Sequence, residues 1–246
     1  GILEWASFYG GANIDQPHSI TTDPSGNIYL TGYTGYSDFK TEATGAFSGA
    51  YLDNMLTSED AFLLRFTDIG KLEWATLFGG SGSDQGYSIT TDISGNIYVV
   101  GVTNYSDLPL QTGIGAFTGA YMDNSYGGGS VSFGDAFVLR FDKTGILEWA
   151  TYYGGKLDDR GFSIKTNSKG DVLVVGDTKS TDFNTQAGTG TYSGAYFDNI
   201  YAGGGNYYGD AFILSFNSSG VLEWATYYGG SSDEGMDSYG NLAIDN

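Results

Sequence analysis

The segment Gly145-Ile-Leu-Glu-Trp-Ala-Thr-Tyr-Tyr-Gly-Gly155 decides the fold, because it recurs with few changes along the 246-residue chain. Its copies are separated by steps of 69, 75 and 75 residues and begin at Gly1, Gly70, Gly145 and Gly220. Such a period indicates one supersecondary unit copied in tandem, each copy burying its apolar faces against its neighbours. We therefore expect one repeat segment over 1–246, with repeats at 1–69, 70–144 and 145–219 and a partial one at 220–246.

The second copy predicts four short antiparallel strands joined in two hairpins. The expected strands are Ser88–Thr91, Asn96–Thr103, Asp135–Phe141 and Leu147–Tyr153. Turn-favouring Asp, Ser, Asn and Gly separate the members of each hairpin. Apolar residues on both faces of the middle strands indicate a sheet covered on both sides. Radial stacking of such sheets gives a β-propeller, so we predict an all-β propeller with three complete blades plus partial ones, and Trp149 buried against the neighbouring blade.

Composition narrows the classes of partner. Acidic residues number 29 against 10 basic ones, a formal charge of −19 that would repel nucleic acid and an anionic membrane surface. The chain has no cysteine, which rules out a disulfide framework and a thiolate metal site. No apolar run approaches the roughly 20 residues that a transmembrane helix needs. We expect neither a nucleic-acid partner nor membrane insertion.

Two features of each unit lie outside the hairpins. The last strand carries a central glutamate, which is expected to mark an outer edge strand and to discourage pairing with another chain: Glu4, Glu73, Glu148 and Glu223. The connection 104–134 is too long for a structureless loop, and a spaced aromatic pair, Phe117 and Tyr121, is predicted to hold it on the blade. Its Gly- and Tyr-rich tip varies between copies and is a candidate binding surface.

Several spaced blocks resemble the SBBP repeat, a seven-bladed β-propeller repeat of bacteria. They are GNIYVVG at 95–101, DAFVLRF at 135–141 and LEWATYYGG at 147–155. The resemblance implies a propeller within a large exported or surface-attached bacterial protein, hence an extracellular or cell-surface location, and no agreed catalytic residues. An extra outer strand is expected at Leu3–Tyr9, whereas 237–244 matches only the turn and second strand of a repeat. We expect a piece of a longer propeller, its ends covered by further blades or by a neighbouring subunit.

Catalytic chemistry finds little support in the sequence. The single histidine, His18, stands at an aromatic position of the repeat, and no Gly-x-Ser-x-Gly segment accompanies it to suggest a catalytic triad. The acid pairs Asp158–Asp159 and Asp233–Glu234 raise the possibility of sugar hydrolysis, which needs two facing carboxylates. Adjacent strand residues point to opposite faces, so only carboxylates from different blades can meet in that way.

An acid follows the Gly-Gly pair in every copy, and these acids are candidate calcium ligands: Asp15, Asp84, Asp159 and Asp233. Asp23, Asp92 and Asp237 lie in the next turn. Oxygen-rich turns can wrap calcium, which takes six to eight oxygen ligands. The alternative is that each aspartate accepts hydrogen bonds from its own turn. Asn167, which replaces the second aspartate in the third copy, favours this alternative.

The leading hypothesis is a non-enzymatic exported scaffold or adhesion module that binds protein or glycan through its long connections. No cofactor is expected, with calcium as the one possible exception. The alternative is a carbohydrate-active propeller enzyme, a glycoside hydrolase or lyase, that uses carboxylates from different blades.

Overall fold

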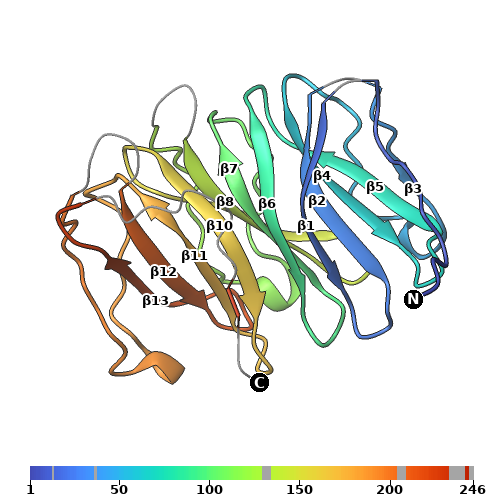
Figure 1. Cartoon of the computed structure of the whole chain (residues 1–246). Coiled ribbons are helices and arrows are strands. Elements are labelled where there is room, and N and C mark those ends of the chain that lie inside the picture. The colour runs from blue at the N-terminus through green and yellow to red at the C-terminus, as the bar shows by residue number, and fades with distance from the viewer. Residues whose placement is uncertain (13, 36–37, 129–133, 204–208, 233–241, 244–246) are drawn as a thin grey trace.

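Three antiparallel four-stranded sheets stand side by side like blades of a fan (Figure 1). The computed structural model describes residues 1–12, 14–35, 38–128, 134–203, 209–232 and 242–243. The four repeat strands of each sheet follow chain order, as the repeat pattern predicted, and in the first sheet a fifth, two-residue strand, β3 (Glu42–Ala43), lies outside the last of them. The strands are β1 (Asp15–Thr22), β2 (Ile28–Thr34), β4 (Asp60–Phe66) and β5 (Leu72–Phe78) in blade 1; β6 (Asp84–Thr91), β7 (Ile97–Thr103), β8 (Asp135–Phe141) and β9 (Leu147–Tyr153) in blade 2; β10 (Asp159–Thr166), β11 (Val172–Thr178), β12 (Asp210–Phe216) and β13 (Leu222–Tyr228) in blade 3.

The first strands β1, β6 and β10 lie next to one another and form the inner edge of the stack. Side chains tie them together across the blades: Ser88 Oγ accepts a hydrogen bond from the N–H of Ile164 (3.3 Å), and Thr166 Oγ1 donates to the carbonyl of Thr91 (3.0 Å). The same two bonds join β1 to β6 through Ser19 and Thr91. Because the contacts recur at each step, the inner strands define the axis expected of a propeller.

The space between blades is filled by aromatic rings. Trp149 is fully buried; its ring lies 5.6 Å from Phe117 of its own blade and 5.0 Å from Phe216 of blade 3. Trp74 takes the same place between blades 1 and 2. The predicted burial of Trp149 against the neighbouring blade is confirmed.

The long connections cover the outer strands. In blade 1 the connection contributes β3 (Glu42–Ala43), which pairs with β5, and in blade 2 Gln111 bridges to Ala150 of β9. Each connection then makes a short 3₁₀ turn, η1 (Gly45–Phe47), η2 (Gly115–Phe117) or η3 (Gly190–Tyr192). Beyond η2, the N–H of Tyr121 donates to the carbonyl of Gly220 in the next blade (2.8 Å). The aromatic pair holds the connection, as predicted, and its second member also reaches the following blade.

This covering corrects the interpretation of the recurring glutamate. The outer strand is not an open edge, and Glu148 does not face solvent there: it forms an ion pair with Arg140 of β8. Glu73 pairs with Arg65 in the same way. In the blades that carry this arginine, the glutamate is the ion-pair partner of a buried arginine. Preventing the outer strand from pairing with another chain is not needed to explain it there.

One expectation about the chain ends is also corrected. Residues 3–9 form no strand, and the described residues hold no further sheet beside them; instead, Tyr9 packs against Phe39 and Phe66 on the open face of blade 1. At the other end, the turn and second strand expected at 237–244 lie outside the described residues except for 242–243. The N–H of Leu242 donates to Ser163 Oγ (3.0 Å). No helix in the described part of the chain has the length and apolarity to cross a bilayer.

Candidate functional site

The tight turns after the three inner strands meet at one end of the axis and enclose a hollow of about 350 Å³. We call this surface the axial turn face. It takes corresponding residues from each blade: Thr22, Asp23 and Pro24; Thr91, Asp92 and Ile93; Thr166, Asn167 and Ser168. Polar groups and exposed apolar side chains alternate around the hollow, with Ile93 74% exposed. Such a mixed, concave surface is suited to binding a polar ligand.

The carboxylates on this face stabilise their own turns. Asp23 accepts hydrogen bonds from the N–H groups of Ser25 (2.8 Å) and Asn27 (3.0 Å), and Tyr29 donates to its second oxygen. Burial alone would raise the pKa of Asp23, but these bonds outweigh it and hold the pKa below 3.8. Asn167 accepts equivalent bonds in blade 3. These aspartates therefore act as turn caps, the alternative that Asn167 favoured in the sequence.

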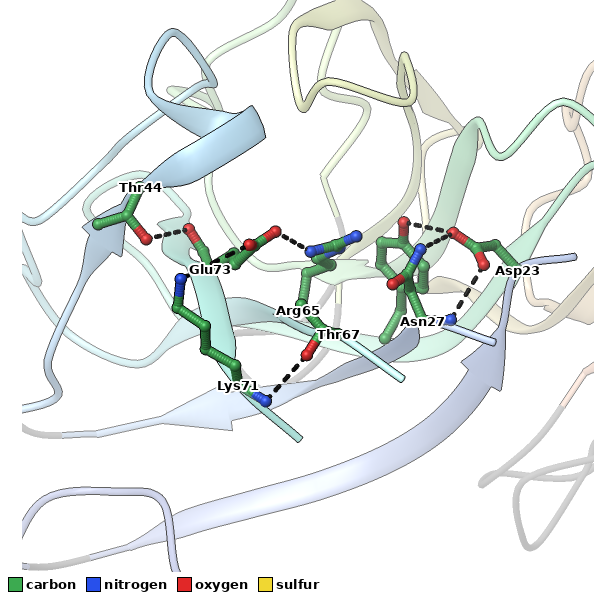
Figure 2. Close-up of polar contacts among 8 residues, drawn as sticks. Asp23, Asn27, Thr44, Arg65, Thr67, Lys71 and Glu73 are labelled. Carbon is green, nitrogen blue, oxygen red and sulfur yellow. Dashed lines mark hydrogen bonds and ion pairs between the residues drawn. The ribbon is translucent and has the colours of Figure 1, made fainter. Parts of the chain in front are cut away.

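A polar chain leads from the axial turn face to the outer strand of blade 1 (Figure 2). It runs from Asp23 through Tyr29 and Arg65 to Glu73. Arg65 also lies 5.0 Å above the ring of Phe47. A second hollow of about 210 Å³ opens above these side chains, and Pro24 and Ile93 line both hollows. The two hollows therefore belong to one surface.

Blade 3 breaks the pattern of buried arginines. Ser215 stands in register with Trp224, where Arg140 stands in register with Trp149. Without an arginine opposite it, Glu223 keeps a buried Oε2 that accepts no hydrogen bond.

The opposite end of the blades carries the predicted calcium-turn aspartates. Asp84 Oδ2 accepts a hydrogen bond from Gly80 N–H, and Asp159 Oδ2 from Gly155 N–H, both at 2.7 Å. Asp15 does the same with Gly11 (2.6 Å). Asp84 and Asp159 are fully buried, whereas Asp15 is partly exposed at the open face of blade 1. Two sequence candidates lie outside the described residues: Asp233, grouped by sequence with Asp84 and Asp159, and Asp237, grouped with Asp23 and Asp92.

Each buried turn aspartate has a second aspartate beside it, which the sequence did not reveal. This second aspartate is the first residue of the third strand of the preceding blade. Asp84 Oδ2 and Asp60 Oδ1 lie 2.7 and 2.8 Å from the point where a Cβ on Gly79 would stand, so at most 5.5 Å separates them. Asp159 and Asp135 flank Gly154 in the same manner. The sequence signal that could have identified these second aspartates is the Asp-Ala-Phe segment that recurs at the start of the third strand.

Burial and mutual repulsion keep these carboxyl groups weakly acidic. Burial, then the neighbouring carboxylates Asp84 and Asp53, raises the pKa of Asp60 to about 7. Burial is also the main cause for the other three, with pKa values of about 6 for Asp84, 8 for Asp135 and 7 for Asp159. Such shifts identify unusual environments, which are frequent at functional sites.

The remaining candidates serve the fold. His18 packs at a tilt against Tyr87 (5.2 Å), which stacks on Phe162 (5.5 Å), so the three rings follow one another along the inner strands. Burial lowers the pKa of His18. Asp158 pairs with Lys179 (3.1 Å), whereas its neighbour Asp159 faces Gly155. Within the described ranges, no three His, Asp or Glu side chains are grouped so as to share a metal ion. The pair Asp233–Glu234 falls outside those ranges.

Comparison with known proteins agrees with the architecture. The SBBP family model, described as a β-propeller repeat, matches residues 4–40 and 73–109. The chain is also similar to an uncharacterized WD repeat-containing protein of Acanthamoeba polyphaga mimivirus, with 29% identity over 177 residues. That alignment takes in 64% of this chain and 12% of the viral protein.

Proposed function

We propose that this chain, whose repeats belong to the SBBP β-propeller repeat family, is a non-enzymatic scaffold that binds a protein or glycan on its axial turn face. As a scaffold or adhesion module it would work at the surface of an exported protein. The single observation that carries the proposal is the hollow to which three consecutive repeats contribute corresponding residues.

The long connections, the binding surface favoured by the sequence, support the proposal less well. Some of their aromatic residues are used inside the molecule, since Phe117 packs on Trp149 and Tyr126 packs edge-on against Tyr152. Tyr105, Tyr196 and Phe197 stay exposed. The axial turn face, in contrast, leaves Pro24 and Ile93 open beside threonine, serine and carboxylate oxygens. Oxygens that accept and donate hydrogen bonds next to apolar surface suit a sugar ring or a polar peptide.

The hydrolase alternative is less well supported by the cross-blade acids, because Asp23 and Asp92, which line the hollow, each accept hydrogen bonds from their own turn. Asp60 with Asp84 and Asp135 with Asp159 do come from different blades, but each of the four is at most 1% exposed. A glycosidase needs its two carboxyl groups on either side of a bound sugar. Acids enclosed between blades do not offer that access.

A printed glycan array together with a panel of surface proteins tests the proposal. Ile93→Arg places a bulky charge at the hollow and is expected to abolish binding. Leu157→Arg is the matched control, because Leu157 is an exposed aliphatic residue on the opposite end of the blades. Met55→Arg, in a long connection, tests the other surface. Loss of binding in Met55→Arg together with full binding in Ile93→Arg would show that the ligand binds the long connections instead. Chemical conversion of a bound ligand would contradict a non-enzymatic role.

A further inference from the structure

The carboxylates between blades have oxygens with no hydrogen-bond partner. Both side-chain oxygens of Asp60 are in this condition, as is one oxygen each of Asp84, Asp135 and Asp159. All four residues are at least 99% buried. A buried charged acceptor without a partner is strongly destabilising, so these oxygens need a proton or a cation.

The described residues supply no positive charge to either pair. Each pair is surrounded by further acids: Asp53 acts on Asp60, Asp107 on Asp84, and Asp123 and Asp158 on Asp135. The ion pairs found in the described part of the chain join basic side chains to other acids: Glu73, Glu148, Asp158, Asp177 and Asp182. Two carboxylates enclosed without a basic partner attract a cation from solution.

We propose that each pair, Asp60 with Asp84 and Asp135 with Asp159, binds one calcium ion that fastens two neighbouring blades together. Calcium accepts carboxylate, carbonyl and water oxygens in irregular arrangements, whereas magnesium demands a near-ideal octahedron. A pair of carboxylates contributed by two different blades imposes no octahedral arrangement and therefore fits calcium better. The proposal is independent of the ligand on the axial turn face.

The first glycine of the Gly-Gly pair supports this assignment. A side chain at Gly79 would bring its Cβ within 2.8 Å of carboxylate oxygens of both Asp60 and Asp84, and Gly154 is limited in the same way by Asp135 and Asp159. Any other residue would clash with both carboxylates, so glycine is what allows the two acids and the Gly-Gly backbone to lie this close.

The two sites differ in one respect that can be measured. Gly127, in the long connection of blade 2, donates its N–H to Asp135 Oδ2 (2.7 Å). The connection of blade 1 is five residues shorter between Asn54 and Asp60, and no hydrogen bond reaches Asp60. Asp60 offers two free oxygens where Asp135 offers one, so we expect the Asp60–Asp84 site to bind calcium more tightly.

Calcium titration of chain 1–246 by isothermal calorimetry, after removal of metal with a chelator, tests the proposal. Asp60→Asn and Asp135→Asn are each expected to lower the stoichiometry by one ion, and Asp60→Asn to remove the tighter site. Asp182→Asn is the matched control, since Asp182 is an exposed acid that accepts a hydrogen bond from Lys156 N–H at the same end of the blades. Its stoichiometry should equal that of the parent chain.

Thermal melts supply a second measurement. Calcium at about 100 times its Kd should raise the Tm of the parent chain by roughly 5–10 °C per site. Asp60→Asn loses no hydrogen bond of the carboxylate, so it remains informative even if Asp135→Asn fails to fold. No binding heat and no Tm shift up to millimolar calcium, or the parent stoichiometry in Asp60→Asn, would overturn the proposal and leave a shared proton as the agent that neutralises each pair.

Discussion

Replacing Ser215 with arginine is expected to stabilise the third blade, because it restores an ion pair that the other two blades possess. Arg65 pairs with Glu73 and Arg140 with Glu148, and both arginine side chains are less than 10% exposed. Ser215 is fully buried at the corresponding position, and Glu223 retains a buried oxygen without a hydrogen bond.

The size of the effect follows from opposing contributions. A hydrogen bond to a charged group contributes about 1.5–3 kcal/mol, whereas ordering an arginine side chain costs up to about 2 kcal/mol. Stacking is limited to one ring, Tyr192, the counterpart of the Phe117 ring that Arg140 covers at 4.6 Å, because Leu173 replaces the tyrosine that Arg140 also approaches in blade 2. We expect a net gain of about 1 kcal/mol, which raises the Tm of a chain of this size by roughly 2–4 °C. The reverse change, Arg140→Ser, should lower the free energy of unfolding by about 3–5 kcal/mol, because it leaves the Glu148 carboxylate without its ion-pair partner.

Urea unfolding in a double-mutant cycle isolates the pair. The gain from Ser215→Arg should disappear in a Glu223→Gln background, since no charge remains for the arginine to meet. Ser219→Arg adds the same charge at an exposed turn position and controls for the lower net negative charge. Equal gains in the Glu223→Gln background, or an equal gain from Ser219→Arg, would refute the reasoning.

Three further outcomes can be checked. Trp149→Ala should cost on the order of 3–5 kcal/mol in a chemical melt, and a loss below about 1 kcal/mol would make this buried ring peripheral. With calcium removed by a chelator, the free energy of unfolding should fall as the pH rises from about 4 to about 8. The pKa values of Asp60, Asp84, Asp135 and Asp159 are raised in the native state, which therefore keeps protons that the unfolded state has lost. A higher urea midpoint at pH 8 than at pH 5 would contradict this. Chain 1–246 should associate through the apolar side chains exposed on its end blades, and light scattering that reports a compact monomer would exclude this.

The blade itself was predictable from the sequence because its strands are local. Asp135–Phe141 and Leu147–Tyr153 agree with β8 and β9 residue for residue. β6 begins four residues before the expected Ser88, since Asp84 pairs with Thr103 at the far end of the hairpin. The Leu3–Tyr9 segment has strand composition but no partner, and composition alone cannot form a sheet.

The candidate sites were less predictable because they join residues of different repeats. Asp84 was chosen as a calcium-turn candidate, but its partner Asp60 stands in the preceding blade, and periodicity does not reveal which ends of two blades touch. The pairing of Glu148 with Arg140 was missed for a related reason: both residues were assigned to strands, but without the register of β8 and β9 they could not be placed side by side.

The bond from each long connection to the following blade has a consequence for how such a chain changes in evolution. Tyr51 N–H binds the carbonyl of Gly145, and Tyr121 N–H that of Gly220, one repeat later. Every junction therefore uses the same donor and the same acceptor, so a duplicated or deleted unit still finds its match on both sides. Recombination between repeats can lengthen or shorten the array by whole units without new compensating substitutions, provided that each unit keeps both its donor tyrosine and its acceptor glycine.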